Sequence, residues 1–567
     1  MVVLKPQSDF GHAPPPQTPY SIITNLPGWD QARSIRDGDM SALSRIVHIY
    51  PRFAPTQFAA ELGQAIAQLV GMEGSVALPY LNPDMGPYTR RHVTLAQRKE
   101  HVMTPDAISL RCVDVGGHRL FVVLYDPKHM LGAMATWSNP GIGLSIRAGE
   151  QLLKHVATMQ EVELPIGGAD ADVMPAPTWT PEGPAHQGLR ERIVELLHRA
   201  PLDPARVATC APGDVYLYPT GMAAVFHTSN ALVRFRPGTI VVLGVVFHNT
   251  YHHLIEESPH GWKHFGRVDE EGIDAFESWL DQETQNGRDV SHVLVEVPGN
   301  PTLDTVDVAR IKKLSEKHGF ILILDDTVAG FGNVDFLAET DVLLTSLTKS
   351  FSGLSNVMGG SIVLNPLSPH FSALSSVFSS THRNELFIAD ADVLLANSRD
   401  FLARTRRLNR NAHAMATFLH GTIGQGDSPV ASVQYPGLLP SKGLYDKYKR
   451  RSDKELPEPG YGCLMTVNFA SVAAAKAFYD RLGFYPSPHL GGHVTLALCY
   501  NMFMFSKNPE EREYMRTCGV KEESVRISAG LEDVEDLIDT LKDALDAAAA
   551  AAEEAKKKHA ETTAKDV

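Results

Sequence analysis

Continuous apolar runs alternate with helical patterns through the middle of the chain. Runs such as "TIVVLGVVF" (239–247) and "VSHVLVEVP" (290–298) are apolar at successive positions, rather than at every second one. Strands of this kind are typical of a parallel sheet that helices cover on both faces. The pattern therefore predicts an α/β fold over about 190–375. The other segments of this block are strands at 320–326 and 341–347 and helices at 190–200, 220–235, 273–285 and 306–319.

The flanking regions have different patterns. Upstream, "PTQFAAELGQAIAQLVGM" (55–72) has helical periodicity and "HRLFVVLYDP" (118–127) indicates a strand, so this region is expected to fold by itself as an α+β unit. Downstream, 384–421 is expected to be largely helical, and 429–540 mixes strands with helices as a smaller α+β domain. A charged insertion at 442–460 is expected to interrupt that domain near its surface.

Proline and glycine content sets the expected domain boundaries. Residues 161–188 contain five prolines and four glycines, which indicates a linker. The predicted units are a loose N-terminal arm (1–20), an N-terminal extension domain (21–160), the linker (161–188), a large domain (189–400), a small C-terminal domain (401–545) and a polar tail (546–567), expected to be a helix that frays.

Composition and charge exclude several classes of function. The 567 residues are 43% hydrophobic and 21% charged, with a formal net charge of −14, which argues against a general nucleic-acid binder and against binding to an anionic membrane. Five scattered cysteines without a C-x-x-C pair argue against a zinc site or a disulfide framework, so no metal is expected. The chain shows neither a signal peptide nor an apolar run of membrane-spanning length, and a cytoplasmic location is expected.

Candidate chemistry gathers where the predicted strands end. Asp325 ends one apolar strand, and Lys349 follows the next strand 24 residues later. Asn300 lies in the turn after a third strand. Ligands of open parallel sheets bind at the carboxyl ends of the strands, so these side chains are expected at one edge. "YPTGMAAVF" places Thr220, Gly221 and Met222 at a helix start, where free N–H groups and the helix dipole suit a phosphate.

A lysine, a buried aspartate and a phosphate cradle are what pyridoxal 5′-phosphate (PLP) requires. The lysine forms a Schiff base with the aldehyde, and the aspartate keeps the pyridine nitrogen protonated so that the ring accepts electrons. Ser346 and Thr348 flank Lys349 and are expected to donate hydroxyl groups to the phosphate. Each signal alone has an ordinary alternative, such as a solvated lysine or a helix cap. Their order and spacing together favour the cofactor.

The motifs resemble those of the Cys/Met-metabolism family of fold-type I PLP-dependent transferases. "SLTKSFSGLSNVMGG", "EVPGNP", "LDDT" and "SVRISAGLEDVEDLI" are similar to four signatures of that family. The chain is most similar to the long, fungal-type cystathionine γ-synthases, which have an N-terminal extension with a "YPRF"-like element, here Tyr50 to Phe53. The resemblance implies a large, mostly parallel-sheet domain, a smaller C-terminal α+β domain and an additional N-terminal α+β region.

The resemblance also implies a role for each site residue. Lys349 would be the Schiff-base lysine, Asp325 the partner of the pyridine nitrogen, and Asn300 a neighbour of the cofactor's 3′-oxygen. Arg526 would bind the substrate α-carboxylate with two hydrogen bonds. The phosphate would be held by Gly221, Met222, Ser346 and Thr348. The implied partners are small amino-acid substrates, an O-acylhomoserine and cysteine, and further copies of the chain in a homodimer or homotetramer.

Two features depart from the family pattern. The aromatic residue that stacks on the pyridine ring is normally a tyrosine in Y-x-x-T, but here "FHNT" places Phe247 there, which keeps the ring and loses the hydroxyl. His248 is adjacent and titrates near neutrality, which makes it a possible substitute for that hydroxyl. The phosphate-binding Tyr/Arg motif, which a neighbouring subunit supplies in the family, is also missing, because 157–188 contain neither arginine nor tyrosine. "PYTRR" (87–91) has suitable letters but lies far upstream.

Three hypotheses for the function remain at this point. The first is γ-replacement on an O-acylated homoserine by cysteine to give cystathionine, a transsulfuration step of methionine biosynthesis. The second is a divergent enzyme of secondary metabolism that forms the same vinylglycine intermediate and adds another nucleophile or releases it by γ-elimination. The third is a catalytically impaired, PLP-binding regulatory paralogue. Phe247 and the missing arginine motif are the features that favour the third.

Overall fold

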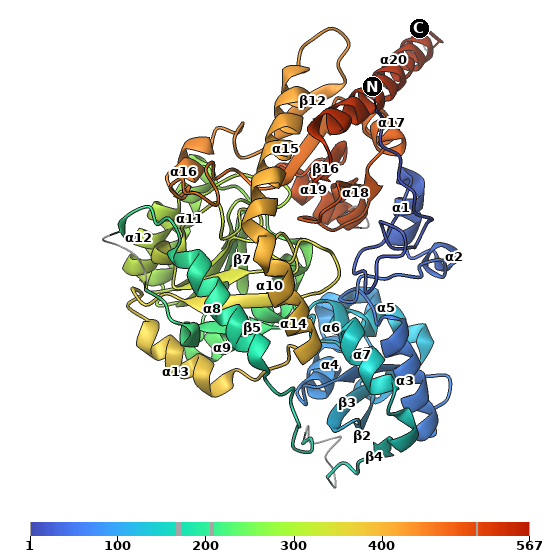
Figure 1. Ribbon diagram of the computed structural model, residues 1–567, viewed down its shortest axis with the longest axis vertical. Helices are drawn as coiled ribbons and strands as arrows, with labels where there is room; N and C mark the ends of the chain where they lie inside the picture. Colours follow the sequence, from blue (N-terminus) through green and yellow to red (C-terminus); the bar gives the residue numbers. More distant parts are fainter. Residues whose placement is uncertain (1, 166–172, 205–208, 506–507, 566–567) are drawn as a thin grey trace.

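Three β-sheets organise the chain. The computed structural model describes residues 2–165, 173–204, 209–505 and 508–565. In Figure 1 the N-terminal domain lies at the lower right, the large domain on the left and the C-terminal domain at the top, with α15 (Phe401–Gly421) running between the last two.

The large domain contains a seven-stranded sheet in the order β5-β11-β10-β9-β8-β6-β7. Every neighbouring pair is parallel except the two pairs that β11 makes, so the predicted mostly parallel α/β fold is confirmed. Gly244, with φ +79°, ends β6 earlier than the apolar run predicts, because the left-handed conformation turns the chain out of the sheet. The strands are β5 (Val215–Tyr218), β6 (Thr239–Leu243), β7 (Trp262–Phe265), β8 (Val290–Glu296), β9 (Ile321–Asp325), β10 (Val342–Thr345) and β11 (Gly360–Leu364).

Helices cover both faces of this sheet, as the continuous apolar strands predict. One buried cluster joins α8, α11, α12 and α14 to the sheet, and a second joins α9, α10 and α13 to its other face. The helices are α8 (Pro184–His198), α9 (Gly221–Phe235), α10 (His248–Glu257), α11 (Glu270–Gln285), α12 (Val308–His318), α13 (Phe371–Thr381) and α14 (Ile388–Asn397). The parallel strands therefore end in loops at one edge of the sheet, where ligands bind.

The N-terminal domain is built on a four-stranded antiparallel sheet in the order β1-β3-β2-β4. Helices α3 and α7 bury one apolar face against it, and α4 to α6 cover the other. The elements are α3 (Gln57–Leu69), β1 (Val76–Tyr80), α4 (Met85–Val93), β2 (Ser109–Val115), β3 (His118–Tyr125), α5 (Met130–Ala133), α6 (Ala135–Ser138), α7 (Ile146–Leu153) and β4 (Gln160–Glu161).

The C-terminal domain has a five-stranded sheet in the order β12-β13-β16-β15-β14. Helices α15, α17 and α20 share one apolar core with this sheet. The elements are β12 (Val430–Gln434), α16 (Lys442–Asp446), β13 (Leu464–Phe469), α17 (Val472–Arg481), β14 (Tyr485–Pro486), β15 (Leu496–Leu498), α18 (Tyr500–Met504), α19 (Pro509–Thr517), β16 (Ser524–Ser528) and α20 (Val534–Lys565). Short 3-10 turns complete the chain at Ala96–His101, Pro105–Ala107, Pro127–His129, Val156–Thr158, Pro212–Asp214, Leu337–Glu339 and Ser398–Asp400.

Residues 2–50 pack against other parts of the chain and do not form a loose arm, which corrects the expectation for the described part of 1–20. The amide of Leu4 donates to Thr540 Oγ1 at 2.9 Å, and Ile22 and Ile23 are buried. Helix α1 (Trp29–Arg36) inserts Trp29 into the core of the C-terminal domain, while α2 (Met40–Leu43) follows it. Figure 1 shows this segment running alongside the C-terminal domain. Its scattered apolar residues have no periodicity of their own because they fill gaps in another domain's surface.

Two other segments are more ordered than predicted. The insertion at 442–460 buries Tyr445 completely and Arg450 to 3% exposure, so it packs against the large domain instead of standing off the surface. The predicted polar tail continues α20 as far as Lys565, and Ala548 is still buried on it. In the linker, 173–183 have no regular structure and α8 begins at Pro184, whereas 166–172 lie outside the described residues.

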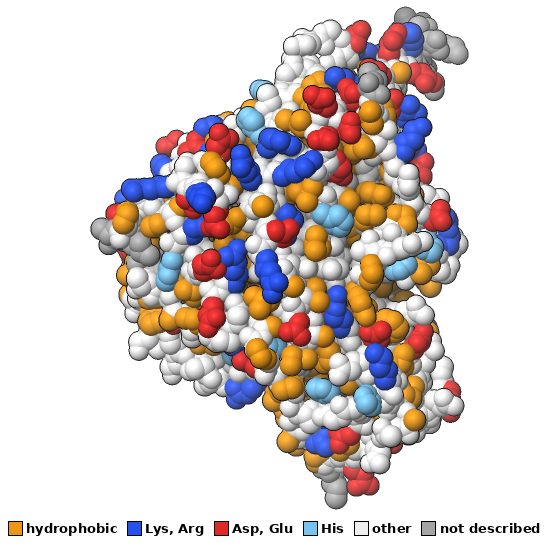
Figure 2. All heavy atoms as spheres, viewed as in Figure 1, with side chains coloured by type: hydrophobic (Ala, Val, Ile, Leu, Met, Phe, Trp, Pro, Cys, Tyr) orange, Lys and Arg blue, Asp and Glu red, His pale blue; other side chains and the backbone are white. Residues whose placement is uncertain are grey.

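Charged side chains of both signs are interspersed on the face of the molecule in Figure 2. No described helix combines the length and the apolarity needed to cross a bilayer.

Candidate active site

Lys349 lies in the turn after β10, inside a cavity at the carboxyl edge of the large sheet. Its Nζ is 3.1 Å from His489 Nδ1 and 5.3 Å from the centre of the Tyr50 ring. No described acidic side chain forms an ion pair with it. Burial, together with the positive charges of Arg52 and Arg526, lowers the Lys349 pKa to about 7, compared with about 10.4 for an ordinary lysine. A substantial fraction of the amine is therefore neutral near pH 7, the form that attacks an aldehyde.

Two carboxyl groups end the adjacent strands β8 and β9. Glu296 and Asp325 face each other in register, and both are buried. Asp325 Oδ1 accepts a hydrogen bond from the Thr327 amide at 2.8 Å, and burial raises the Asp325 pKa to about 6. A buried carboxyl with no cationic partner fits a ligand that carries a protonated ring nitrogen, because that nitrogen would supply the missing positive charge.

The start of α9 approaches the turn that carries Lys349 very closely. A Cβ on Gly221 would lie 2.7 Å from Ser346 Cβ, so the contact needs a glycine. Arg52 of the N-terminal domain reaches this cavity from above Phe247, with its guanidinium 5.0 Å from that ring's centre. Arg52 is 3% exposed, donates to the Ser138 carbonyl at 2.7 Å and forms no ion pair with a described residue. A buried guanidinium without a counter-ion, next to a helix N-terminus, fits a phosphate.

Arg526 in β16 is the second buried guanidinium of the cavity. It is 3% exposed, donates to Asn300 Oδ1 at 3.0 Å and to the Pro488 carbonyl at 2.7 Å, and lies 4.3 Å from the Tyr500 ring centre. It too forms no ion pair with a described side chain. Two arginines that line one cavity with Lys349 can thus hold two anionic groups, such as a phosphate and a carboxylate.

The structure brings most of the predicted site residues together. Gly221, Met222, Phe247, Asn300, Asp325, Ser346, Lys349 and Arg526 all line one cavity. Thr220 and Thr348 do not line it, which corrects their expected place at the cofactor and the expected role of Thr348 as a hydroxyl donor to the phosphate. Thr220 Oγ1 caps α9 by accepting from the Ala223 amide and donates to the Gly141 carbonyl, and Thr348 Oγ1 is paired with both the amide and the carbonyl of Gly359.

The side chains that line the site but were not predicted to belong to it include Tyr50, Arg52, Glu296, His489 and Tyr500. Tyr50 and Arg52 have the Tyr-x-Arg spacing of the element that a neighbouring subunit supplies in the family, and in this structure they line the cavity of their own chain. The only signal in the sequence was "YPRF" itself, which has the right residue spacing but lies about 300 positions before Lys349. "PYTRR" lies on α4 away from the cavity, so it is not the missing motif.

Arg52→Gln is expected to weaken PLP binding by at least about 30-fold, because truncating one partner of a buried charge pair costs about 2 kcal/mol or more. The dissociation constant is measured by titrating the apo protein with PLP and following the visible absorbance. Arg33→Gln is the matched control, because Arg33 lies on the surface of α1 and is half exposed. Unchanged binding by the Arg52 variant would show that the phosphate is held elsewhere.

Comparisons with known proteins agree with this geometry. Residues 206–546 match the model of a family described as Cys/Met metabolism PLP-dependent enzyme. Alanine racemase ungC of Aspergillus violaceofuscus is 29% identical over 96% of this chain and 97% of its own length. Cystathionine gamma-synthase-like protein ankD of Aspergillus thermomutatus is 30% identical over 94% of both chains. The solved cystathionine gamma synthase of Xanthomonas oryzae pv. oryzae, in complex with aminoacrylate and cysteine, shares the fold at 21% identity and a TM-score of 0.50, over 66% of this chain and all of that one.

Proposed function

Because this chain belongs to the Cys/Met metabolism family of PLP-dependent enzymes, we propose that it catalyses a γ-replacement on an amino acid that carries a leaving group at Cγ. An O-acylated homoserine is the proposed substrate and the thiol of cysteine the proposed nucleophile. One observation carries the proposal: the partly buried Lys349 lines one cavity with two buried guanidinium groups, Arg52 and Arg526, and none of the three forms an ion pair with a described acidic residue. That arrangement suits a cofactor phosphate on one side and an amino-acid carboxylate on the other.

The residues of the site fit PLP. Lys349 would bind it covalently, Asp325 would face its ring nitrogen, Arg52 and the start of α9 would hold its phosphate, and Phe247 would stack on its ring. When bound, PLP supplies a protonated ring that accepts the electron pair of the bond broken at Cα.

The protein's own side chains then handle the substrate and its protons. Arg526 would bind the α-carboxylate through its two N–H groups and so place the Cα–H bond near Lys349. Lys349 Nζ would take the Cα proton, for which its lowered pKa suits it. His489 Nδ1, 3.1 Å from Nζ, would accept a hydrogen bond from the lysine and hold it in place, because burial and the charge of Lys349 keep the His489 pKa well below its usual value and the ring neutral.

A second candidate function is racemisation at Cα. Phe247 has no hydroxyl to assist a leaving group at Cγ, whereas proton transfer at Cα can use Lys349 and needs no hydroxyl at the position of Phe247. Alanine racemase ungC, which is similar over nearly the whole chain, supports this candidate. Incubating the holoenzyme with O-acetyl- or O-succinylhomoserine, with and without cysteine, and separately with L-alanine distinguishes the two. Cystathionine supports γ-replacement, D-alanine supports racemisation, and an unchanged visible spectrum with all of these would contradict both.

Phe247→Tyr is expected to raise the γ-replacement rate by about tenfold, because it restores a hydroxyl that can protonate the leaving group; a well-placed general acid contributes roughly 10²–10⁴. The measurement is cystathionine formed per active site. Phe247→Leu is the matched variant: it removes the ring and is expected to weaken PLP binding without raising the rate. If Phe247→Tyr leaves the rate unchanged, a missing hydroxyl at this position does not limit γ-replacement.

We also propose that the chain assembles into a homodimer or homotetramer in solution, as the family resemblance implies. Analytical ultracentrifugation of the holoenzyme tests this, and a monomer at micromolar concentration would contradict it.

A further inference from the structure

A cluster of potential metal ligands lies directly beside the active site. His248 and His252 are one turn apart on α10, so their rings share one face of the helix, with centres 4.3 Å apart. Glu511 on α19 approaches from the C-terminal domain, and its Oε1 is 2.7 Å from His252 Nε2. One ligand atom from each of the three residues lies within 4.8 Å of the other two. All three are partly buried.

The three ligand atoms of this cluster are buried, and their hydrogen bonding is incomplete. His248 Nδ1 has no hydrogen-bond partner in the described structure, whereas His252 Nε2 and Glu511 Oε1 lie 2.7 Å apart and form an ion pair when His252 is protonated. Buried polar groups are almost always hydrogen-bonded, because leaving one unpaired costs about 1–3 kcal/mol. A cation placed among the three atoms would satisfy His248 Nδ1 and would replace the proton between His252 and Glu511.

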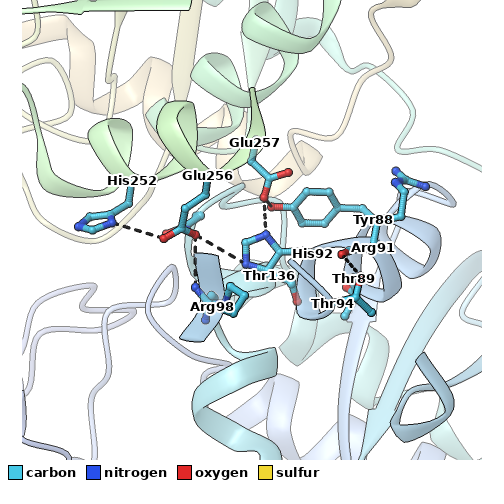
Figure 3. A network of polar contacts seen from close by, with 12 residues as sticks. Tyr88, Thr89, Arg91, His92, Thr94, Arg98, Thr136, His252, Glu256 and Glu257 are labelled. Carbon is cyan, nitrogen blue, oxygen red and sulfur yellow. Dashed lines mark hydrogen bonds and ion pairs between the residues drawn. The ribbon is translucent and has the colours of Figure 1, made fainter. Parts of the chain in front are cut away.

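A second layer of side chains supports the cluster (Figure 3). His252 Nδ1 is 3.4 Å from Glu256 Oε1, one turn further along α10. Glu256 is in turn held by Arg98 Nη1 at 3.3 Å, with His92 Nε2 at 3.9 Å, both from the N-terminal domain. Histidines that bind metals commonly place the other ring nitrogen against a carboxylate, which sets the tautomer and makes the ligand more basic.

We propose that His248, His252 and Glu511 bind one divalent transition-metal ion, with Zn²⁺ as the best match and a water molecule as the fourth ligand. Two imidazoles and one carboxylate with an open position are an established zinc ligand set, and imidazole nitrogen favours zinc over magnesium or calcium. The carboxylates of Glu511 and Glu256 balance the charge of the ion.

The position of the site suggests what the ion does. Helix α10 starts directly after Phe247, and the Phe247 amide donates to Glu296 Oε1 at 2.7 Å. A metal bound to His248 and Glu511 would tie the start of this helix to α19 and so hold the Phe247 ring in place. The role would be structural, and His248 would then be a ligand rather than the substitute acid considered from the sequence. The cysteine spacing gave no indication of such a site, whereas the H-x-x-x-H spacing of 248–252 is compatible with it.

Zinc stoichiometry tests the proposal. Untagged holoenzyme is stripped with a chelator, dialysed, and titrated with zinc sulfate, with bound zinc measured by mass spectrometry of the metal; one tightly bound Zn²⁺ per chain is expected. Cobalt(II) provides a second readout, since a four-coordinate site absorbs visible light far more strongly than the hydrated ion. His252→Gln and Glu511→Gln are expected to weaken zinc binding by more than the roughly 10–100-fold typical of outer-layer changes.

His253→Gln is the matched control, because His253 is on the same helix, faces Phe226 and is not a proposed ligand, so it should bind zinc as the wild type does. The Glu511→Gln variant keeps the shape of the side chain, so its zinc binding can be measured even if a histidine variant fails to fold. The alternative to a metal ion is a protonated His252 that forms ion pairs with both Glu256 and Glu511. Wild-type protein that takes up no zinc, or a His252→Gln protein that binds it equally well, would overturn the proposal.

Discussion

Lys349→Ala is expected to abolish the visible Schiff-base absorption and to reduce turnover by about 10³-fold or more. The substitution removes both the covalent attachment of PLP and the group that would take the Cα proton, and a positioned proton acceptor alone contributes roughly 10²–10⁴. PLP would still bind non-covalently through Arg52 and Asp325. The measurements are the absorption spectrum after dialysis and the steady-state rate with the best substrate.

Lys442→Ala is the control for this variant, because Lys442 is on the surface of α16 and pairs with Asp446. A second check uses the wild-type apo protein. Since only the neutral amine attacks the aldehyde, PLP uptake should accelerate as the pH rises through the Lys349 pKa of about 7 and level off above about pH 8. An uptake rate that continues to rise up to pH 10 would show that Lys349 has an ordinary pKa and that burial does not tune it.

Arg526→Gln is expected to raise the KM for the amino-acid substrate by about 30-fold to 1,000-fold with PLP still bound. Removing a buried, hydrogen-bonded charge that pairs with a ligand typically costs about 2–5 kcal/mol, and a cost of about 2–4 kcal/mol corresponds to the expected rise in KM. KM and kcat are measured separately. Loss of positioning should also lower kcat, whereas the spectrum of the enzyme without substrate should remain unchanged.

Two further variants test whether Arg526 binds the substrate carboxylate through its two-pronged geometry. Arg526→Lys keeps the charge but not the two-pronged geometry, so its KM should lie between those of the wild type and Arg526→Gln. Arg481→Gln is the surface control, because Arg481 is 60% exposed and pairs with Asp543. If Arg526→Gln has a normal KM, the carboxylate binds elsewhere in the cavity, and Arg52 would be the next residue to substitute.

The sequence patterns predicted correctly those features that depend on the order of residues within a short segment of the chain. The runs that became β8, β9 and β10 are mostly apolar, and parallel strands place their carboxyl ends at one edge. Asp325 and Lys349, 24 residues apart, could therefore be placed in one site. The assignment of Thr220 and Thr348 failed at the next level of detail. A motif shows that a hydroxyl is near the site. The backbone group to which that hydroxyl forms a hydrogen bond depends on the packing of α9 and of the loop before β11.

The sequence by itself determined the α/β architecture, the lysine–aspartate pair and the identity of the cofactor, because each follows from periodicity, strand order and the chemistry of single residues. Only the tertiary structure decided which distant segments complete the cavity. The N-terminal domain contributes Tyr50 and Arg52, the C-terminal domain contributes His489, and α10 of the large domain pairs with α19 of the C-terminal domain. No local sequence pattern encodes contacts between residues hundreds of positions apart. The sequence placed Lys349 at the end of an apolar strand, but its surroundings, with two guanidinium groups and a neutral histidine, depend on how the domains pack.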